Sequence, residues 1–283
     1  MPPTGEAFAY PHFVKEREEP TMKKLLAIIL TLTVLLALAG CGGEGTTLRK
    51  VEKAGKLVIA TSPDFPPFES LSGDGKVEGI EIDILEAICQ ELGVTLEIQQ
   101  MDFEAVLPGV QAGKYDVGVS GITVTESRQK NVLFTDPYCL AAQAIVVTEG
   151  SPITCKADLT GKTVAVQTGT TAESFCMSSG YSVSAFAANN DAELALVQGK
   201  VDAWVIDDLT AADMVAVYNA QGGGQLVILD EAMTTEPYAF ALAFGSEDTV
   251  AKMNEILAQM QSEGTVAAIF QKYNAPFTAP GEG

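Results

Sequence analysis

The amino-acid sequence predicts an α/β protein made of two units, each a mainly parallel sheet flanked by helices. Short apolar runs bounded by Gly or Pro, such as 57–61 and 162–166, alternate along the chain with amphipathic stretches such as 80–92. Runs that are apolar throughout are typical of strands buried on both faces, and the amphipathic stretches supply the covering helices. Two units are predicted because the alternation starts again near residue 145.

The first unit opens with a strand at 57–61, because the apolar run LVIAT lies between Gly55 and Pro63. A helix is predicted at 80–92, where apolar residues recur at helical spacing until Gly93 ends the pattern. The remaining elements are a strand at 95–99, a helix at 103–111 and a strand at 115–120.

The second pass begins with a strand at 144–147. Glycines at 199 and 264 end two of its predicted helices, as is common at helix C-termini. The same rules predict strands at 162–166, 203–206, 226–229 and 239–244, and helices at 171–177, 191–198, 211–218, 250–263 and 266–273.

The amino-terminal segment has the pattern of an export signal. Residues 1–21 are polar, and we interpret them as a gene-model extension ahead of a start codon at Met22. A lysine pair at 23–24 then precedes an apolar run at 25–39. Because a membrane span needs about 20 apolar residues, this shorter run predicts a secretory leader at 22–40.

The leader ends in Leu-Ala-Gly-Cys at 38–41, which resembles the lipobox of bacterial lipoproteins. The alternative is an ordinary cleavage site that happens to precede a cysteine. Lipidation would place two acyl chains on Cys41, which suffices for stable anchoring. We therefore expect an extracytoplasmic protein anchored to the outer face of the plasma membrane, with a tether at 41–55.

Charge and histidine content exclude several classes of function. With 17 basic and 37 acidic residues the formal net charge is −20, so no general surface for nucleic acid is present. The single histidine, His12, lies in the segment that we expect to be absent from the mature protein. Histidine-based triads and metal sites are thereby excluded, and no metal or cofactor is predicted.

Four cysteines lie beyond the predicted anchor: Cys89, Cys139, Cys155 and Cys176. An exported protein can form disulfides, and four cysteines allow three pairings, among which the sequence does not choose. Cys89 lies in an apolar helical stretch, which predicts a buried thiol.

The segment SGITVTESR, which ends at Arg128, is the first candidate binding site. Thr125 followed by Glu126 is an N-cap signal, which places Arg128 in a first helical turn. A cation there opposes the helix macrodipole, so a bound carboxylate would compensate it, with the Thr123 hydroxyl and backbone N–H groups completing an anion site. The alternative is a surface arginine paired with Glu126 or Asp136.

The loop 167–171 (QTGTT) is the second candidate, between a strand and a helix. Its small residues would turn backbone N–H groups toward an acceptor, although the lysine and spacing of a P-loop are missing. The alternative is helix capping by Thr170 or Thr171, with Glu173 as the partner.

Asp207 and Asp208 are the third candidate, because they follow the strand at 203–206. Ligands of open α/β sheets bind at the carboxyl ends of strands, where a buried carboxylate needs a cationic partner such as an ammonium group. The alternative is that both are helix caps. Among the aromatic residues, Phe65 and Phe103 are candidates for lining a crevice, whereas Trp204 is predicted to lie in the core.

Taken together, these segments resemble the amino-acid-type solute-binding proteins of ABC importers, the type 2 periplasmic binding proteins. The resemblance runs from about 57 to 273 and is carried by LVIATSPDFPPFE, the G-x-E-I-D-I stretch, MDFEAVLPGVQAGKYDVGVSGITVTESRQKNVLFTDPY, DLTGKTVAVQTGTTAE, KVDAWVIDD and EGTVAAIFQKY. It implies a two-lobed Venus-flytrap that binds an amino acid, delivers it to a permease in the plasma membrane and acts as a monomer.

The resemblance also implies lobe boundaries. Lobe 1 would contain 56–142 and 236–276, and lobe 2 would contain 143–235. The two hinge crossings would lie near 138–144 and 233–239.

By the same resemblance, the α-carboxylate of the ligand would be held by Arg128 and its α-ammonium by Asp207. A ligand with both groups would then bridge the two lobes. The positions that complete the implied set are Gly121, Thr123 and Thr171 around the charged groups, and Phe65 with Phe103 against the ligand.

Two positions bear on the ligand side chain. Binders of basic amino acids often carry Asp where this chain has Ser62, and glutamine-type members have Lys where it has Gln167. Asp64 and Glu69 lie nearby and could replace the missing acid. The pattern favours a polar or moderately sized amino acid.

Two other functions compete with this interpretation. Some relatives with this fold resemble cyclohexadienyl or arogenate dehydratases, for which Glu173 would be the proton donor. The other is the sensory domain of a kinase or channel, against which stands the lack of a second apolar span. We expect a binding protein that is not an enzyme.

Overall fold

The computed structural model describes residues 46–222, 224–231 and 233–280. Every element below belongs to the unit that spans residues 42–283. The predicted extension at 1–21, the leader at 22–40 and the lipidation site Cys41 lie outside the described residues.

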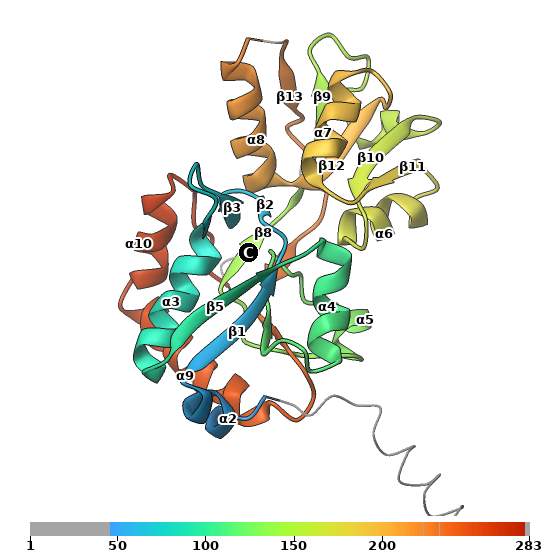
Figure 1. Cartoon of the computed structure of the whole chain (residues 1–283). Helices are drawn as coiled ribbons and strands as arrows, with labels where there is room; N and C mark the ends of the chain where they lie inside the picture. The colour runs from blue at the N-terminus through green and yellow to red at the C-terminus, as the bar shows by residue number, and fades with distance from the viewer. Residues whose placement is uncertain (1–45, 223, 232, 281–283) are drawn as a thin grey trace, which may run out of the picture. The chain divides into compact units, whose positions relative to one another are not determined.

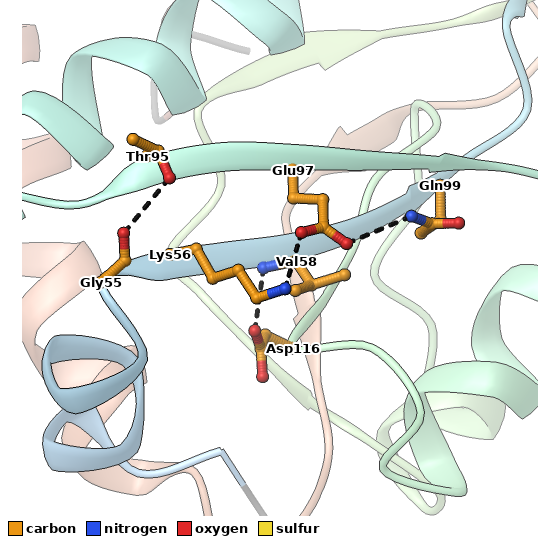
Figure 2. Close-up of polar contacts among 7 residues, drawn as sticks. All are labelled: Gly55, Lys56, Val58, Thr95, Glu97, Gln99 and Asp116. Atoms are coloured by element: carbon orange, nitrogen blue, oxygen red, sulfur yellow. Dashed lines mark hydrogen bonds and ion pairs between the residues drawn. The ribbon is translucent and has the colours of Figure 1, made fainter.

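Lobe 1 is organised around a five-stranded sheet with the order β5-β1-β6-β15-β7 (Figure 1). Ile59 in the centre of β1 pairs with Ile98 on one side and Val117 on the other, both in parallel register. Figure 2 shows polar contacts beside these paired strands. Lys56 Nζ lies 2.7 Å from Glu97 Oε2, and the Asp116 carboxylate accepts the Val58 N–H at 2.8 Å. The strands are β1 Lys56–Thr61, β5 Thr95–Gln100, β6 Val117–Gly118, β7 Leu133–Phe134 and β15 Ala241–Leu242.

Helices cover both faces of this sheet, as alternation along β1 requires. Leu57 and Ile59 point into a core shared with α3 Ile80–Leu92, whereas Ala60 points into the core of α4 Phe103–Gln111. The other elements of the lobe are α2 Leu48–Ala54, α5 Glu126–Gln129, α9 Glu247–Ser262 and α10 Thr265–Lys272, with the short strands β2 Asp64–Phe65, β3 Glu69–Leu71 and β4 Val77–Glu78.

Lobe 2 repeats the plan with a sheet of order β11-β10-β12-β9-β13 (Figure 1). Trp204 and Ile206 of β12 face one core, and Ala203 and Val205 face the other. Trp204 is completely buried, as predicted. The elements are β9 Gln143–Thr148, β10 Thr163–Gln167, β11 Ser182–Phe186, β12 Ala203–Asp207 and β13 Leu226–Ile228, with the 3-10 helix η1 Lys156–Leu159 and helices α6 Thr171–Ser178, α7 Asn189–Val197 and α8 Asp208–Ala220.

Two antiparallel strands connect the sheets. β8 Cys139–Ala141 leads from lobe 1 toward β9, and β14 Glu236–Tyr238 leads back toward β15. Leu140 pairs with Pro237 at the centre of this ladder. Both strands lie within the stretches where hinge crossings were expected.

Each sheet is mainly parallel, as predicted, but one strand in each runs opposite to the other four. In lobe 1, β1 makes parallel pairs with β5 and β6, but β15 is antiparallel to β6 and β7. Lobe 2 has the same mixture, with β9 antiparallel to both of its neighbours. The cause is the connectivity, because β9 and β15 arrive directly from the crossing strands instead of through a helix.

The predicted tether at 41–55 is also corrected, for its described part. Residues 48–54 form helix α2, in which Val51 is buried and the Thr47 hydroxyl accepts the Lys50 N–H. Thr46 is buried as well, and its backbone N–H donates to Ser246 Oγ at 2.8 Å. The folded domain therefore starts about ten residues earlier than expected.

The described cysteines Cys89, Cys139, Cys155 and Cys176 are unpaired thiols. Cys89 is buried, as predicted, and its burial together with the charge of Glu86 raises its pKa to about 11. Within the described part of the chain, no helix is both long and apolar enough to span a membrane.

Candidate functional site

A cavity that is partly open to solvent lies where the carboxyl ends of strands from both lobes meet. This is the edge at which open α/β sheets bind ligands. The residues around it are Phe65, Phe103, Ser120, Gly121, Thr123 and Arg128 from lobe 1 and Gln167, Thr170, Thr171, Ala172, Asn189, Val205, Ile206 and Asp207 from lobe 2.

Arg128 lies on the short helix α5, where the Thr125 hydroxyl accepts its backbone N–H at 3.2 Å, as the predicted N-cap requires. Its Nη1 donates to the Thr123 carbonyl at 2.9 Å, and its Nη2 donates across the lobes to the Gly169 carbonyl at 3.2 Å. The Phe103 ring centroid lies 5.6 Å from its Cζ, within cation–π range.

The argument that predicted Arg128 as an anion ligand was partly wrong. α5 has only four residues, so Arg128 lies in its last turn as well as its first and opposes little dipole. The alternative, an ion pair of Arg128 with Glu126 or Asp136, is absent too. Among the described residues, no carboxylate lies within 4 Å of the Arg128 guanidinium. Burial lowers the Arg128 pKa, and the charges of Glu236 and Asp207 act against that shift.

Asp207 ends β12 at the N-cap position of α8 and is 8% exposed. The Tyr238 hydroxyl donates to its Oδ2. Burial first, and the nearby Glu236 carboxylate second, raise the Asp207 pKa to about 8, because both disfavour the ionised form. No side chain forms a cap hydrogen bond at the start of α8; Asp208 Oδ1 accepts the N–H groups of Ala142 and Leu209.

Gly121 is held by a buried acid. Its N–H donates to Glu81 Oε2 at 2.9 Å, and the other oxygen of Glu81 accepts the Tyr138 hydroxyl at 2.6 Å. Gly121 has a φ of +53°, and a Cβ there would overlap the Phe65 ring. Only glycine therefore suits this wall of the cavity.

A second buried acid, Glu69, lies close to Glu81. Glu69 Oε1 accepts the Ser120 hydroxyl at 2.8 Å, and burial together with the charge of Glu81 raises the pKa of Glu69 well above its ordinary value. The direction of this shift is the one that repulsion between two neighbouring buried carboxyl groups produces. Glu81 was predicted only as part of the G-x-E-I-D-I resemblance, although an acid between two isoleucines indicates a buried role.

The lobe 2 wall is formed by the loop 167–171. Thr170 Oγ1 accepts the Glu173 N–H at 3.1 Å, and the Glu173 carboxylate accepts the Gly169 N–H at 2.7 Å. Helix capping, the alternative for this loop, is thus present, and it leaves the Thr171 side chain at the cavity. Thr171 Oγ1 accepts a hydrogen bond from Gln143 Nε2 at 2.9 Å.

Eight of the nine residues predicted to bind ligand line this cavity, and Ser62 does not. The Ser62 hydroxyl instead donates to Asp64 Oδ1 at 2.7 Å. Asn189, which follows strand β11, also lines the cavity and was not predicted. The strand before it, β11, was not predicted from the sequence, so only the structure places Asn189 at the carboxyl end of a strand.

Within the described part of the chain, no group of three or more His, Cys, Asp or Glu side chains is placed to hold a metal ion.

The chain is similar to amino-acid-binding proteins of known name. It is 30% identical to the probable histidine-binding protein of Neisseria gonorrhoeae over 268 residues, which cover 90% of this chain and 96% of the relative. It is 29% identical to the arginine-binding extracellular protein ArtP of Bacillus subtilis, over 89% of this chain and 98% of the relative.

Solved structures agree with these relatives. A mutant of the arginine-binding protein ArgBP from T. maritima superposes with a TM-score of 0.76 at 35% identity and covers 81% of this chain and 99% of its own. An ancestral arginine-binding protein bound to glutamine gives a TM-score of 0.73 at 38% identity, over 78% and 99% of the two chains.

A third structure is an ancestral amino-acid-binding protein described as a precursor of cyclohexadienyl dehydratase, with a TM-score of 0.73 at 32% identity over 81% of this chain and 99% of that one. The family profile of bacterial extracellular solute-binding proteins, family 3, matches residues 57–276. With this match across most of the chain and the two-lobed fold of amino-acid-binding proteins, the chain belongs to family 3 of the bacterial extracellular solute-binding proteins.

Proposed function

We propose that this protein is an extracytoplasmic receptor that closes its two lobes around one amino acid and delivers it to the permease of an ABC importer. One observation carries the proposal. A guanidinium from lobe 1, Arg128, and a buried carboxyl group from lobe 2, Asp207, line the same cavity, and no ion pair within 4 Å joins them among the described residues.

An α-amino acid supplies the missing partners of both groups. Its carboxylate would take the N–H donors of Arg128 that Thr123 and Gly169 leave unused, and its ammonium would meet Asp207 and the Gly121 carbonyl. Relatives named for histidine and arginine binding, and one structure bound to glutamine, support the class of ligand.

Such a ligand would also drive closure, because it contacts the two lobes together only when they are closed. Residues 143–235 are proposed to move as lobe 2 against 56–142 and 236–276, with β8 and β14 as the hinge. The permease would recognise the closed form, and the receptor would act as a monomer.

The test is a calorimetric titration with the twenty amino acids, in the wild type and in Arg128→Ala. We expect the variant to weaken binding of every amino-acid ligand at least about hundredfold, because breaking a buried charge pair costs several kcal/mol. Arg49→Ala, which removes an exposed arginine on α2, is the control and should bind normally. Unchanged affinity in Arg128→Ala, or no binding of any amino acid by the wild type, would refute the proposal.

The dehydratase alternative gains no support from Glu173. That carboxylate accepts the Gly169 N–H and is not among the residues lining the cavity. We propose a binding protein without catalysis. Turnover of arogenate or prephenate by the purified protein would contradict this.

Anchoring is proposed from the sequence alone, with translation starting at Met22, removal of 22–40 and lipidation of Cys41. We expect Cys41→Ser to move the protein from the membrane fraction into the soluble extracytoplasmic fraction, because two acyl chains are lost. Cys155→Ser, which alters another cysteine, should leave the protein in the membrane fraction. A membrane-bound Cys41→Ser protein would rule out the lipid anchor.

A further inference from the structure

Gln167 and Asn189 form a polar patch of the cavity wall. Neither residue is needed to bind the α-carboxylate or the α-ammonium of the proposed ligand. Both are almost completely buried, at 4% and 1% exposed, and both line the cavity from lobe 2. Asp64 of lobe 1 contacts both of them.

The orientation of the Gln167 amide follows from its neighbours. Its Nε2 lies 3.0 Å from Asp64 Oδ2 and 3.1 Å from the Ala187 carbonyl. Both neighbours are hydrogen-bond acceptors, so the nitrogen and not the oxygen must face them, and both amide hydrogens are used. Gln167 Oε1 is left to accept a hydrogen bond, which comes from Asn189 Nδ2 at 3.0 Å.

This contact orients Asn189 in turn. Its Nδ2 faces Gln167 Oε1 and, at 3.4 Å, the Asp64 carbonyl, so its amide hydrogens are also used. Its Oδ1 has no hydrogen-bond partner among the described residues. This wall of the cavity therefore offers an acceptor and no side-chain amide donor.

The charged side chain next to this wall, Asp64, is negative. Asp64 accepts hydrogen bonds from the Ser62 hydroxyl, from Gln167 Nε2 and from the Asn189 N–H at 2.7 Å. Among the described residues, no Lys or Arg lies within 4 Å of its carboxylate. A carboxylate with no cationic partner within 4 Å, beside a wall whose unpartnered side-chain group is an acceptor, disfavours an anionic ligand and favours a cationic one.

We propose that Asp64, Gln167 and Asn189 select the side chain of the bound amino acid, by admitting side chains that donate hydrogen bonds and rejecting acidic ones. Among ligand side chains that donate hydrogen bonds, a cationic one is preferred over a neutral one of the same shape. The inference rests on the proposed function and names the class of amino acid at that same site.

Isosteric ligand pairs test this selection in the wild-type protein. Glutamine and glutamate differ only in an amide against a carboxylate, and arginine and citrulline only in a guanidinium against a neutral ureido group. Calorimetry should give at least tenfold tighter binding for glutamine than for glutamate and for arginine than for citrulline. Glutamate binding as tightly as glutamine would overturn the proposal.

Asp64→Asn identifies the cause, since it removes the charge and keeps the shape, and its amide oxygen can still accept the Asn189 N–H and Gln167 Nε2. The gap between glutamine and glutamate should shrink at least tenfold. Ser62→Ala, which removes a hydrogen bond to the same carboxylate but keeps its charge, should retain the gap. An unchanged gap in Asp64→Asn would show that Asp64 does not select.

Asn189→Leu serves as the second variant, because it removes the unpartnered acceptor without changing charge. Glutamine should lose at least tenfold in affinity, whereas alanine, whose methyl group forms no hydrogen bonds, should bind as in the wild type. Equal losses for both ligands would overturn the assignment. If none of the twenty amino acids binds the wild type, the proposed function itself fails; if some bind without these preferences, only the present inference fails.

Discussion

Asp207 connects ligand binding to pH. Its pKa of about 8 means that the ligand-free protein holds a proton on this carboxyl group at neutral pH. The groups that act on it are Glu236 and Asp208, which raise the pKa, and Tyr238 and Arg128, which lower it. An α-ammonium beside Asp207 favours the ionised form, so binding should release a proton. Affinity should then rise by about tenfold per pH unit between pH 6 and 7, and level off above about 8, where most of the carboxyl groups are already ionised.

Calorimetry at pH 6, 7 and 8 in buffers of different ionisation enthalpy measures both the affinity and the protons released. The ligand-free protein should behave in the opposite way: a carboxyl pKa raised by folding contributes stability at low pH, which is lost as the pH rises toward 8. Asp207→Asn should bind weakly and remove most of the pH dependence. Affinity of the wild type that is flat between pH 6 and 8 would contradict a protonated Asp207.

At the scale of the elements, local patterns predicted most of the fold. Helices α3 and α4 begin and end at the predicted residues, since Gly93 with a φ of +68° ends the first and the loop before Phe103 starts the second. Strands were predicted too long where the ladder is short. The expected strand at 239–244 pairs only at Ala241–Leu242, because it joins the sheet antiparallel from the crossing strand β14.

The binding set could be predicted where a local motif marks it, as for Arg128 after its Thr125 cap and Asp207 at a strand end. The contact of Asp64 with Asn189 could not, because 125 residues separate them and no periodicity connects the lobes. Ser62 was wrongly predicted to line the ligand site for a related reason. Its hydroxyl donates to the neighbouring Asp64, and its position in the motif does not reveal this contact.

At the scale of the whole domain, hydrogen bonds from the side chains of Asp64, Gln167, Asn189 and Arg128 join the two lobes. Asp64 Oδ2 of lobe 1 accepts the Asn189 N–H and Gln167 Nε2 of lobe 2, at 2.7 and 3.0 Å. Arg128 Nη2 of lobe 1 donates to the Gly169 carbonyl of lobe 2 at 3.2 Å. The described lobes are therefore in a closed arrangement, and part of the free energy of closure comes from the protein itself.

Asp64→Ala should open the ligand-free protein, because it removes two hydrogen bonds to a charged acceptor, each worth about 1.5–3 kcal/mol. Small-angle scattering should show a larger radius of gyration than for the ligand-free wild type, and a saturating amino acid should restore the compact value. Apparent affinity weakens in proportion to the lost closed population, by about tenfold or more. Ser62→Ala, whose hydrogen bond to Asp64 stays within lobe 1, is the matched control and should keep the wild-type radius. Identical ligand-free radii for wild type and Asp64→Ala would mean that these hydrogen bonds do not set the closed population, and that closure depends on the ligand alone.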